Sequence, residues 1–109
     1  MYSNWEDLEK SIINCKKCKL CTNRNNIVFG QGNKNADIML IGEGPGADED
    51  RLGQPFVGKA GKLMNSAFEG LEIKRDELYI ANIVKCRPPA NRVPEADEAE
   101  ACLDYLRNQ

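Results

Sequence analysis

Two short hydrophobic runs predict two buried strands. Residues 37–42 read Asp-Ile-Met-Leu-Ile-Gly, an apolar run that ends in glycine, and residues 78–84 form a second run of this kind. Continuous rather than alternating hydrophobicity is typical of strands that are covered on both faces. We therefore expect both segments to be fully buried in a sheet.

The spacing of apolar residues predicts three helices around these strands. A first helix should lead into Cys15, because Ser3 and Glu6 form a capping-box pattern and Trp5, Leu8 and Ile12 follow at helical spacing. A second should begin near Lys59, with an apolar face formed by Ala60, Leu63, Met64, Ala67, Phe68 and Leu71. Pro94 can start a third, on which Ala96, Ala99, Leu103 and Leu106 share a face.

The order of these elements predicts an α/β fold. Residues 16–26 and 43–58 are rich in polar residues, glycine or proline, and we expect both to be loops. Strand, loop, helix and strand in succession form a βαβ unit with a parallel pair of strands and a right-handed crossover. Ligands bind beyond the carboxyl ends of such strands, so residues 42–46 and 82–87 are the candidate site segments.

Length and composition indicate a single domain over residues 1–109. The chain is 41% hydrophobic and 29% charged, and its net charge of -2 predicts no general attraction to nucleic acid, so DNA affinity requires a local patch. No apolar run approaches the ~20 residues that span a bilayer, and no signal-peptide pattern is present. We expect a cytoplasmic protein without a membrane partner.

The last predicted helix has an apolar face with nothing downstream to pack against it. This pattern suggests a fragment of a larger domain, truncated after that helix. An uncovered face of the C-terminal helix would also allow the chain to self-associate.

Four of the five cysteines form two separated pairs, Cys15-x2-Cys18 and Cys86-x15-Cys102. An odd number of cysteines in a reducing compartment is more often metal-binding than disulfide-bonded. Thiolates select zinc or iron-sulfur centres, and the wide second pair favours a [4Fe-4S] cluster over zinc. Zinc and buried cysteines without a metal stay open as alternatives. Cys21 is the expected spare, although its spacing to Cys18 does not exclude it.

The glycine-rich segment Gly42-x-Gly44-x-Gly46 is a weak match to a dinucleotide-binding loop, because Pro45 removes an amide donor where a phosphate would need one. The segment does allow a flat ligand to approach the backbone closely. Glu43 is the ionisable group beside it. A tight turn with a solvated glutamate explains the same pattern.

Three other features near these strand ends have a functional and a structural interpretation. Phe56 lies in a loop that should face the same crevice, where it could stack on a base or cover the core. Asn82 could present its amide to a base edge or end a strand. Lys85, Arg87 and Arg92 could clamp a phosphate or form a solvated loop.

Taken together, four ordered segments resemble the family 4 uracil-DNA glycosylases, the iron-sulfur branch of that superfamily. These segments are Cys15-x2-Cys18-x-Leu20, Gly42-Glu43-Gly44-Pro45-Gly46, Pro55-Phe56-Val57-Gly58 and Asn82-x2-Lys85-Cys86-Arg87-Pro88-Pro89. The resemblance implies a partial three-layer α/β/α domain whose substrate is uracil-containing DNA. Such DNA-repair enzymes hydrolyse the N-glycosidic bond of a uracil flipped out of the helix.

The resemblance also implies roles for individual residues. A structural [4Fe-4S] cluster would be held by Cys15, Cys18, Cys86 and Cys102, with Cys21 as the spare. Glu43 lies in the water-activating motif, Phe56 would stack on uracil, and Asn82 would read the uracil edge. Gly42 and Gly44 would line the pocket, although the family often has alanine in the position of Gly44.

One departure concerns catalysis directly. The family has a later histidine-containing motif that stabilises the uracil anion, and this chain contains no histidine. We therefore expect little or no glycosylase activity from these residues alone. Two alternatives remain open, a non-catalytic iron-sulfur module that binds nucleic acid and a small structural domain stapled by zinc.

Overall fold

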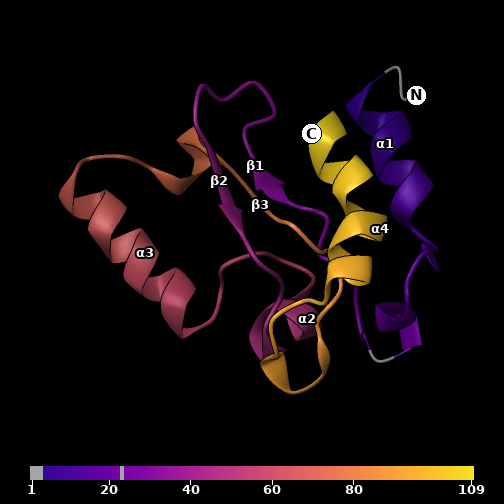
Figure 1. The fold of residues 1–109 in the computed structure, drawn as a ribbon. Helices are drawn as coiled ribbons and strands as arrows, with labels where there is room; N and C mark the ends of the chain where they lie inside the picture. The colour runs from indigo at the N-terminus through magenta and orange to yellow at the C-terminus, as the bar shows by residue number, and fades with distance from the viewer. Residues whose placement is uncertain (1–3, 23) are drawn as a thin grey trace.

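The computed structural model describes residues 4–22 and 24–109 (Figure 1). The helices are α1 (Trp5–Ile12), α2 (Ala47–Leu52), α3 (Lys59–Gly70) and α4 (Ala96–Asn108). Single 3-10 turns are η1 (Lys19–Thr22), η2 (Arg75–Glu77) and η3 (Pro89–Asn91). The strands are β1 (Gln31–Gly32), β2 (Met39–Gly42) and β3 (Tyr79–Asn82).

The three strands form one mixed sheet in the order β1-β3-β2. β2 and β3 are parallel, with Met39 opposite Tyr79 and Gly42 opposite Asn82, and α3 lies between them in the chain. The predicted βαβ unit is therefore confirmed. β1, which the hydrophobic pattern did not predict, pairs antiparallel with β3.

Burial differs between the two predicted strands. Every residue of β3 is buried, as expected for a strand with a neighbour on each side. The prediction that residues 37–42 are fully buried is wrong, since Ile38 is 53% exposed and Ile41 is 54% exposed. β2 lies at the edge of the described sheet, so its side chains are flanked by those of a neighbouring strand on one side only.

α1 and α4 lie side by side on one side of the sheet, so helices far apart in sequence pack together (Figure 1). The buried core between them and the end of β3 consists of Leu8, Ile12, Leu20, Val84, Cys86, Cys102 and Tyr105. The buried face of α4 carries Glu98, Cys102 and Tyr105. The apolar residues predicted to share a face, Ala96, Ala99, Leu103 and Leu106, are instead exposed or half-buried.

Side chains fix the starts of two helices. α1 begins after Asn4, whose Oδ1 accepts the N–H of Asp7 at 2.8 Å, while the predicted cap, Ser3, lies outside the described residues. α2 lies inside the predicted loop of residues 43–58. Its start is fixed by Glu49, whose carboxylate accepts the N–H of Gly46 at 3.0 Å.

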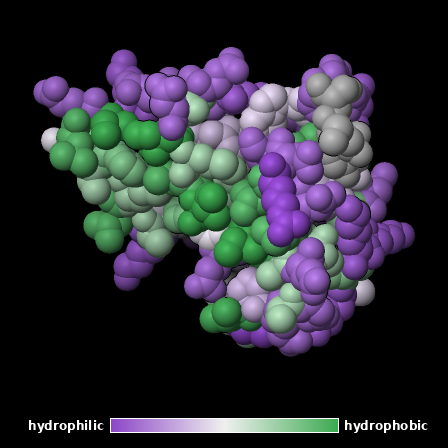
Figure 2. All heavy atoms as spheres, turned by 45° about the horizontal axis from the view of Figure 1, so that its top comes forward, coloured by the Kyte–Doolittle hydropathy of each residue, from purple (hydrophilic) through white to green (hydrophobic). Residues whose placement is uncertain are grey.

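α3 forms over the predicted residues, but its apolar face is largely uncovered. Leu63 is 73% exposed and Leu71 is 68% exposed. Figure 2 shows the resulting hydrophobic area on the α3 side of the molecule. None of the helices in residues 4–22 and 24–109 combines the length and hydrophobicity needed to cross a membrane.

A buried ion pair fixes the start of α4. The Glu98 carboxylate is fully buried and accepts from both terminal nitrogens of Arg92, each at 2.7 Å, and from the N–H of Glu95 at 2.9 Å. The Arg92 hydrogen bonds lower the pKa of Glu98 to about 2, against an ordinary value of 4.5. The pair therefore contributes stability above pH 4.5 and loses it as the pH falls towards 2.

We predict that Glu98→Gln destabilises the protein at pH 7 by about 1–3 kcal/mol, because hydrogen bonds to a charged buried group are lost. The variant should also lose less of its remaining stability than the parent between pH 5 and pH 2, a window set by that lowered pKa. Urea unfolding at a series of pH values measures both effects. Glu100→Gln, at an exposed position of the same helix, is the control. Parallel pH profiles for the parent and Glu98→Gln would contradict the prediction.

Candidate functional site

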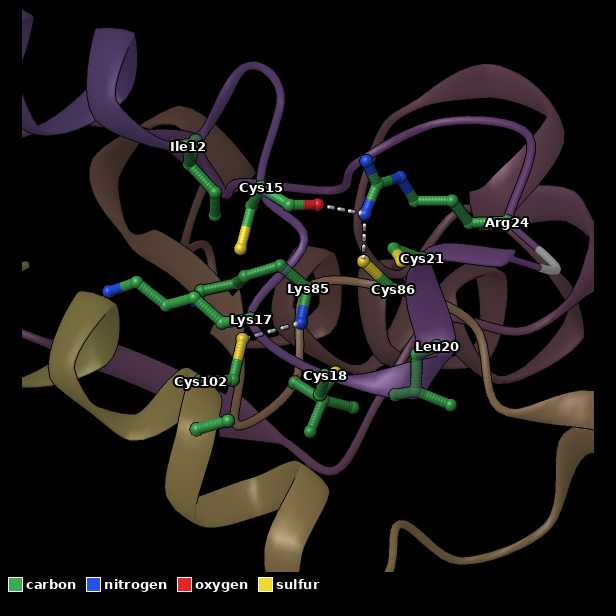
Figure 3. A pocket seen from close by; sticks show the side chains of 12 residues that line it. Ile12, Cys15, Lys17, Cys18, Leu20, Cys21, Arg24, Lys85, Cys86 and Cys102 are labelled. Atoms are coloured by element: carbon green, nitrogen blue, oxygen red, sulfur yellow. Dashed lines mark hydrogen bonds between the residues drawn. The ribbon is translucent and has the colours of Figure 1, made fainter.

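All five cysteines line one pocket between α1, η1, the end of β3 and α4 (Figure 3). Cys15 and Cys18 lie in the segment after α1, Cys86 follows β3, and Cys102 lies on α4. Cys21, predicted as the spare, lines the same pocket from η1. The structure thus brings the two separated pairs together without distinguishing Cys21 by position alone.

Two N–H donors point at sulfur atoms of this pocket (Figure 3). Arg24 Nη1 donates to Cys86 Sγ at 3.3 Å and to the carbonyl of Cys15 at 2.8 Å. The backbone N–H of Lys85 donates to Cys102 Sγ at 3.3 Å. Donors of this kind stabilise negative charge on sulfur, as the outer shell of a thiolate-ligated metal does.

Burial has the opposite effect on these thiols. It raises the pKa of Cys18 and of Cys86, and it raises the pKa of Cys102 to about 11. Desolvation disfavours a thiolate, and the two N–H donors do not fully offset it. A bound cation would supply the missing positive charge, which is how a metal deprotonates its own ligands.

The donor set limits which inorganic group the pocket fits. It offers sulfur ligands from separate segments, which suit zinc or an iron-sulfur centre. Within residues 4–22 and 24–109, no group of three or more Cys, Asp or Glu side chains is arranged to hold one metal ion. The five cysteines nevertheless line one common pocket.

Lys85 joins this pocket to the end of β3. Its side chain is fully buried, and its Nζ donates to the carbonyl of Asn82 at 2.8 Å and to Gln109 Oε1 at 2.6 Å. Burial lowers the pKa of Lys85 to about 8. The suggested phosphate clamp of Lys85, Arg87 and Arg92 is not formed as expected, because Lys85 faces inward and Arg92 is paired with Glu98.

A second site lies where β2 and β3 end. Gly42 and Asn82 are opposite each other in the parallel register, and the half-buried ring of Phe56 lies beside them. A Cβ placed on Gly42 would be 2.5 Å from Asn82 Oδ1 and 2.6 Å from Phe56 Cζ. The Phe56 ring and the Asn82 amide, both candidate site groups from the sequence, therefore meet beside Gly42. Only glycine fits there, because a Cβ would collide with both groups.

Glu43 and Gly44 lie at the same edge of the sheet. The Glu43 carbonyl accepts the N–H of Val84 at 3.1 Å, while its side chain is exposed. Gly44 packs closely on Val84, whose Cγ2 would lie 2.8 Å from an added Cβ. Glu43 and Gly44 line an open hollow together with Arg92. The exposed carboxylate of Glu43 thus lies directly after Gly42, on backbone that is paired with Val84.

Several residues that shape this edge were missed by sequence reasoning. The buried Asp50 accepts from the backbone and side-chain nitrogens of Asn25 at 2.8 and 2.9 Å, which fixes α2 against the loop after Arg24. Glu49 and Arg75 both contact the Phe56 loop. The Gly46-x-x-Glu49 capping pattern was a signal for Glu49, whereas no local pattern indicated Arg75.

Comparison with known proteins gives consistent matches. The model of the uracil DNA glycosylase superfamily matches residues 29–109. The chain is 51% identical to a type-4 uracil-DNA glycosylase of Sulfurisphaera tokodaii, over 95% of this chain and 48% of that protein. It is 46% identical to the type-4 enzyme of Archaeoglobus fulgidus, over 95% of this chain and 52% of that protein.

A bacterial relative gives the same result. The type-4 uracil-DNA glycosylase of Thermotoga maritima is 44% identical, over 100% of this chain and 58% of that protein. The chain spans about half the length of the curated relatives that it matches.

The crowding at Gly42 generates a stability prediction. Gly42→Ala should lower the free energy of unfolding by about 1–3 kcal/mol, because the new methyl group must displace the Phe56 ring or the Asn82 amide. Gly70→Ala is the matched control, since nothing lies within 4 Å of a Cβ there, and it should leave stability unchanged or slightly raised. Urea unfolding measures both variants. Equal stabilities for Gly42→Ala and the parent would contradict the close approach.

Proposed function

The chain belongs to the uracil-DNA glycosylase superfamily, and we propose that it carries the uracil-recognising and cluster-binding part of a type-4 enzyme that repairs DNA. The reaction is hydrolysis of the N-glycosidic bond of a uracil flipped out of DNA. Residues 1–109 would form part of one such domain. The proposed substrate is uracil-containing DNA.

The observation that carries the proposal is the meeting of Phe56, Asn82 and Gly42 at the carboxyl ends of the two parallel strands. A flat ring offers a stacking surface to a base, and base stacking on an aromatic side chain is worth about 1–3 kcal/mol. An amide both donates and accepts hydrogen bonds, which matches the alternating edge of uracil. A crevice at the strand ends is where ligands bind in such sheets.

The proposed mechanism uses these groups in sequence. The extruded uracil stacks on Phe56, and the Asn82 amide holds its hydrogen-bonding edge. Glu43, exposed at the adjacent position, orients a water towards the sugar carbon as the glycosidic bond breaks. Charge develops on the departing uracil, and the chain has no histidine to stabilise it. We therefore expect this chain to bind uracil-containing DNA but to hydrolyse the glycosidic bond slowly.

We also propose a [4Fe-4S] cluster in the cysteine pocket, held by Cys15, Cys18, Cys86 and Cys102. When bound, the cluster supplies positive charge to buried thiolates and links the N-terminal segment to α4. The separation of Cys86 and Cys102 in the sequence, with Cys102 on α4, favours this assignment over a zinc ribbon. The N–H bonds to Cys86 and Cys102 suit ligands that are thiolates. Cys21 is then the spare thiol.

Binding of single-stranded oligonucleotides tests the recognition directly. The chain should bind a uracil-containing strand more tightly than the same strand with cytosine, whose hydrogen-bonding edge has an amino donor in place of the O4 acceptor. Phe56→Ala should weaken binding of both strands about tenfold, because stacking does not depend on which base is stacked. Asn82→Ala should reduce the uracil-over-cytosine preference about tenfold, because it removes the contact to that edge. Fluorescence anisotropy gives the dissociation constants, and uracil release from the same strands gives the turnover, which we expect to be low.

Two matched substitutions control for general damage. Phe68→Ala removes a half-buried aromatic from α3, and Asn108→Ala removes an exposed amide from α4. Both should keep the affinity and the uracil preference of the parent. A parent chain that binds uracil and cytosine strands equally would contradict the proposed function.

A further inference from the structure

Phe56 is held in an unfavourable backbone conformation. Its φ is 51°, in the left-handed region that residues with a side chain rarely adopt. Such strain persists only where surrounding contacts determine the conformation, and it concentrates at functional sites. The contacts that hold Phe56 therefore decide where its ring points.

Glu49 holds the chain that follows Phe56. Its Oε2 accepts the N–H of Val57 at 2.9 Å and of Gly58 at 2.7 Å, while Oε1 accepts the N–H of Gly46. Burial opposes ionisation of this carboxyl, but the backbone donors, led by Gly58, outweigh it and lower the pKa of Glu49. The carboxylate therefore acts as a charged acceptor for two consecutive amides.

Arg75 holds the chain from the opposite side. Its Nη1 donates to the Phe56 carbonyl at 2.8 Å, and its Nη2 donates to the Pro55 carbonyl. The same guanidinium bonds Asn65 on α3 at 3.1 Å and Gln31 on β1 at 3.3 Å. A guanidinium is a rigid fork of donors, so it can fix two consecutive carbonyls at once.

The start of α3 completes this arrangement. A Cβ on Gly61 would lie 1.9 Å from the Phe56 carbonyl oxygen, so the loop packs directly on a residue without a side chain. Arg75 belongs to η2, which leads into β3, and β3 ends at Asn82. The Arg75 side chain thus connects the loop around Phe56 to the segment that carries the Asn82 amide.

We propose that Glu49 and Arg75 are positioning residues that clamp the backbone around Phe56 and thereby hold its ring beside Gly42 and Asn82. Neither residue touches the base; each acts through Phe56. This inference rests on the proposed function for its effect on uracil binding. The conformational half of the inference, that Glu49 and Arg75 hold the backbone of Phe56, does not depend on the proposed function. The clamp fixes the φ of Phe56 whether or not a base is bound.

A double-mutant cycle separates positioning from general stability. Arg75→Lys keeps the charge but cannot fork across two carbonyls, so it should weaken binding of the uracil-containing strand about tenfold, as loss of stacking would. In a Phe56→Ala background the same substitution should cost nothing further. Arg51→Lys, at an exposed arginine on α2, is the control and should keep the affinity of the parent. An equal loss in both backgrounds, or no loss in either, overturns the inference.

Nuclear magnetic resonance tests the conformational half on the same protein. A residue with positive φ gives a strong intraresidue NOE between Hα and HN, and this signal should be present at Phe56 in the parent and weakened in Arg75→Lys. Glu49→Gln, which removes the charge with little change in size, should speed amide exchange at Val57 and Gly58. It provides the second variant if Arg75→Lys fails to fold.

The two proposals fail in different ways. A parent without uracil preference contradicts the proposed function, and the NOE at Phe56 then decides the clamp alone. Retention of the full NOE in Arg75→Lys overturns the clamp, whatever the binding results.

Discussion

The pocket formed by the cysteines is the feature on which the arrangement of this chain depends. It gathers the segment after α1, the end of β3 and the middle of α4, and Cys86 and Cys102 belong to the buried core beside Leu8, Ile12 and Tyr105. A small domain buries limited apolar area, so the metal centre proposed for this pocket would add stability that packing alone does not supply. The terminal helices pack together around this point.

The cysteine pocket and the strand-end site share one structural connection. The backbone N–H of Lys85 bonds Cys102 Sγ, and its buried Nζ bonds the carbonyl of Asn82. Lys85 therefore links the cysteine pocket directly to the end of β3. On the other side of Asn82, Phe56 is set by the contacts of Glu49 and Arg75. The proposed recognition of a base would thus depend on both sets of contacts, which meet at the same strand end.

Local sequence patterns predicted the helices and strands better than they predicted the burial and contacts of those elements. Apolar runs and helical spacing identified the βαβ unit, because these signals lie within each segment. The exposure of Ile41 depends on β2 being an edge strand, which sequence spacing does not encode. α2 was missed because glycines and prolines outweighed the cap supplied by Glu49. The Arg75 contacts join residues 19 and 20 positions apart, so no local pattern indicates them.

Metal and sulfide analysis of anaerobically purified protein decides which centre the cysteines hold. We expect about four iron and four acid-labile sulfide per chain, lost in Cys102→Ser and kept in Cys21→Ser. Zinc without sulfide, or an equal loss of iron from both variants, would contradict this expectation.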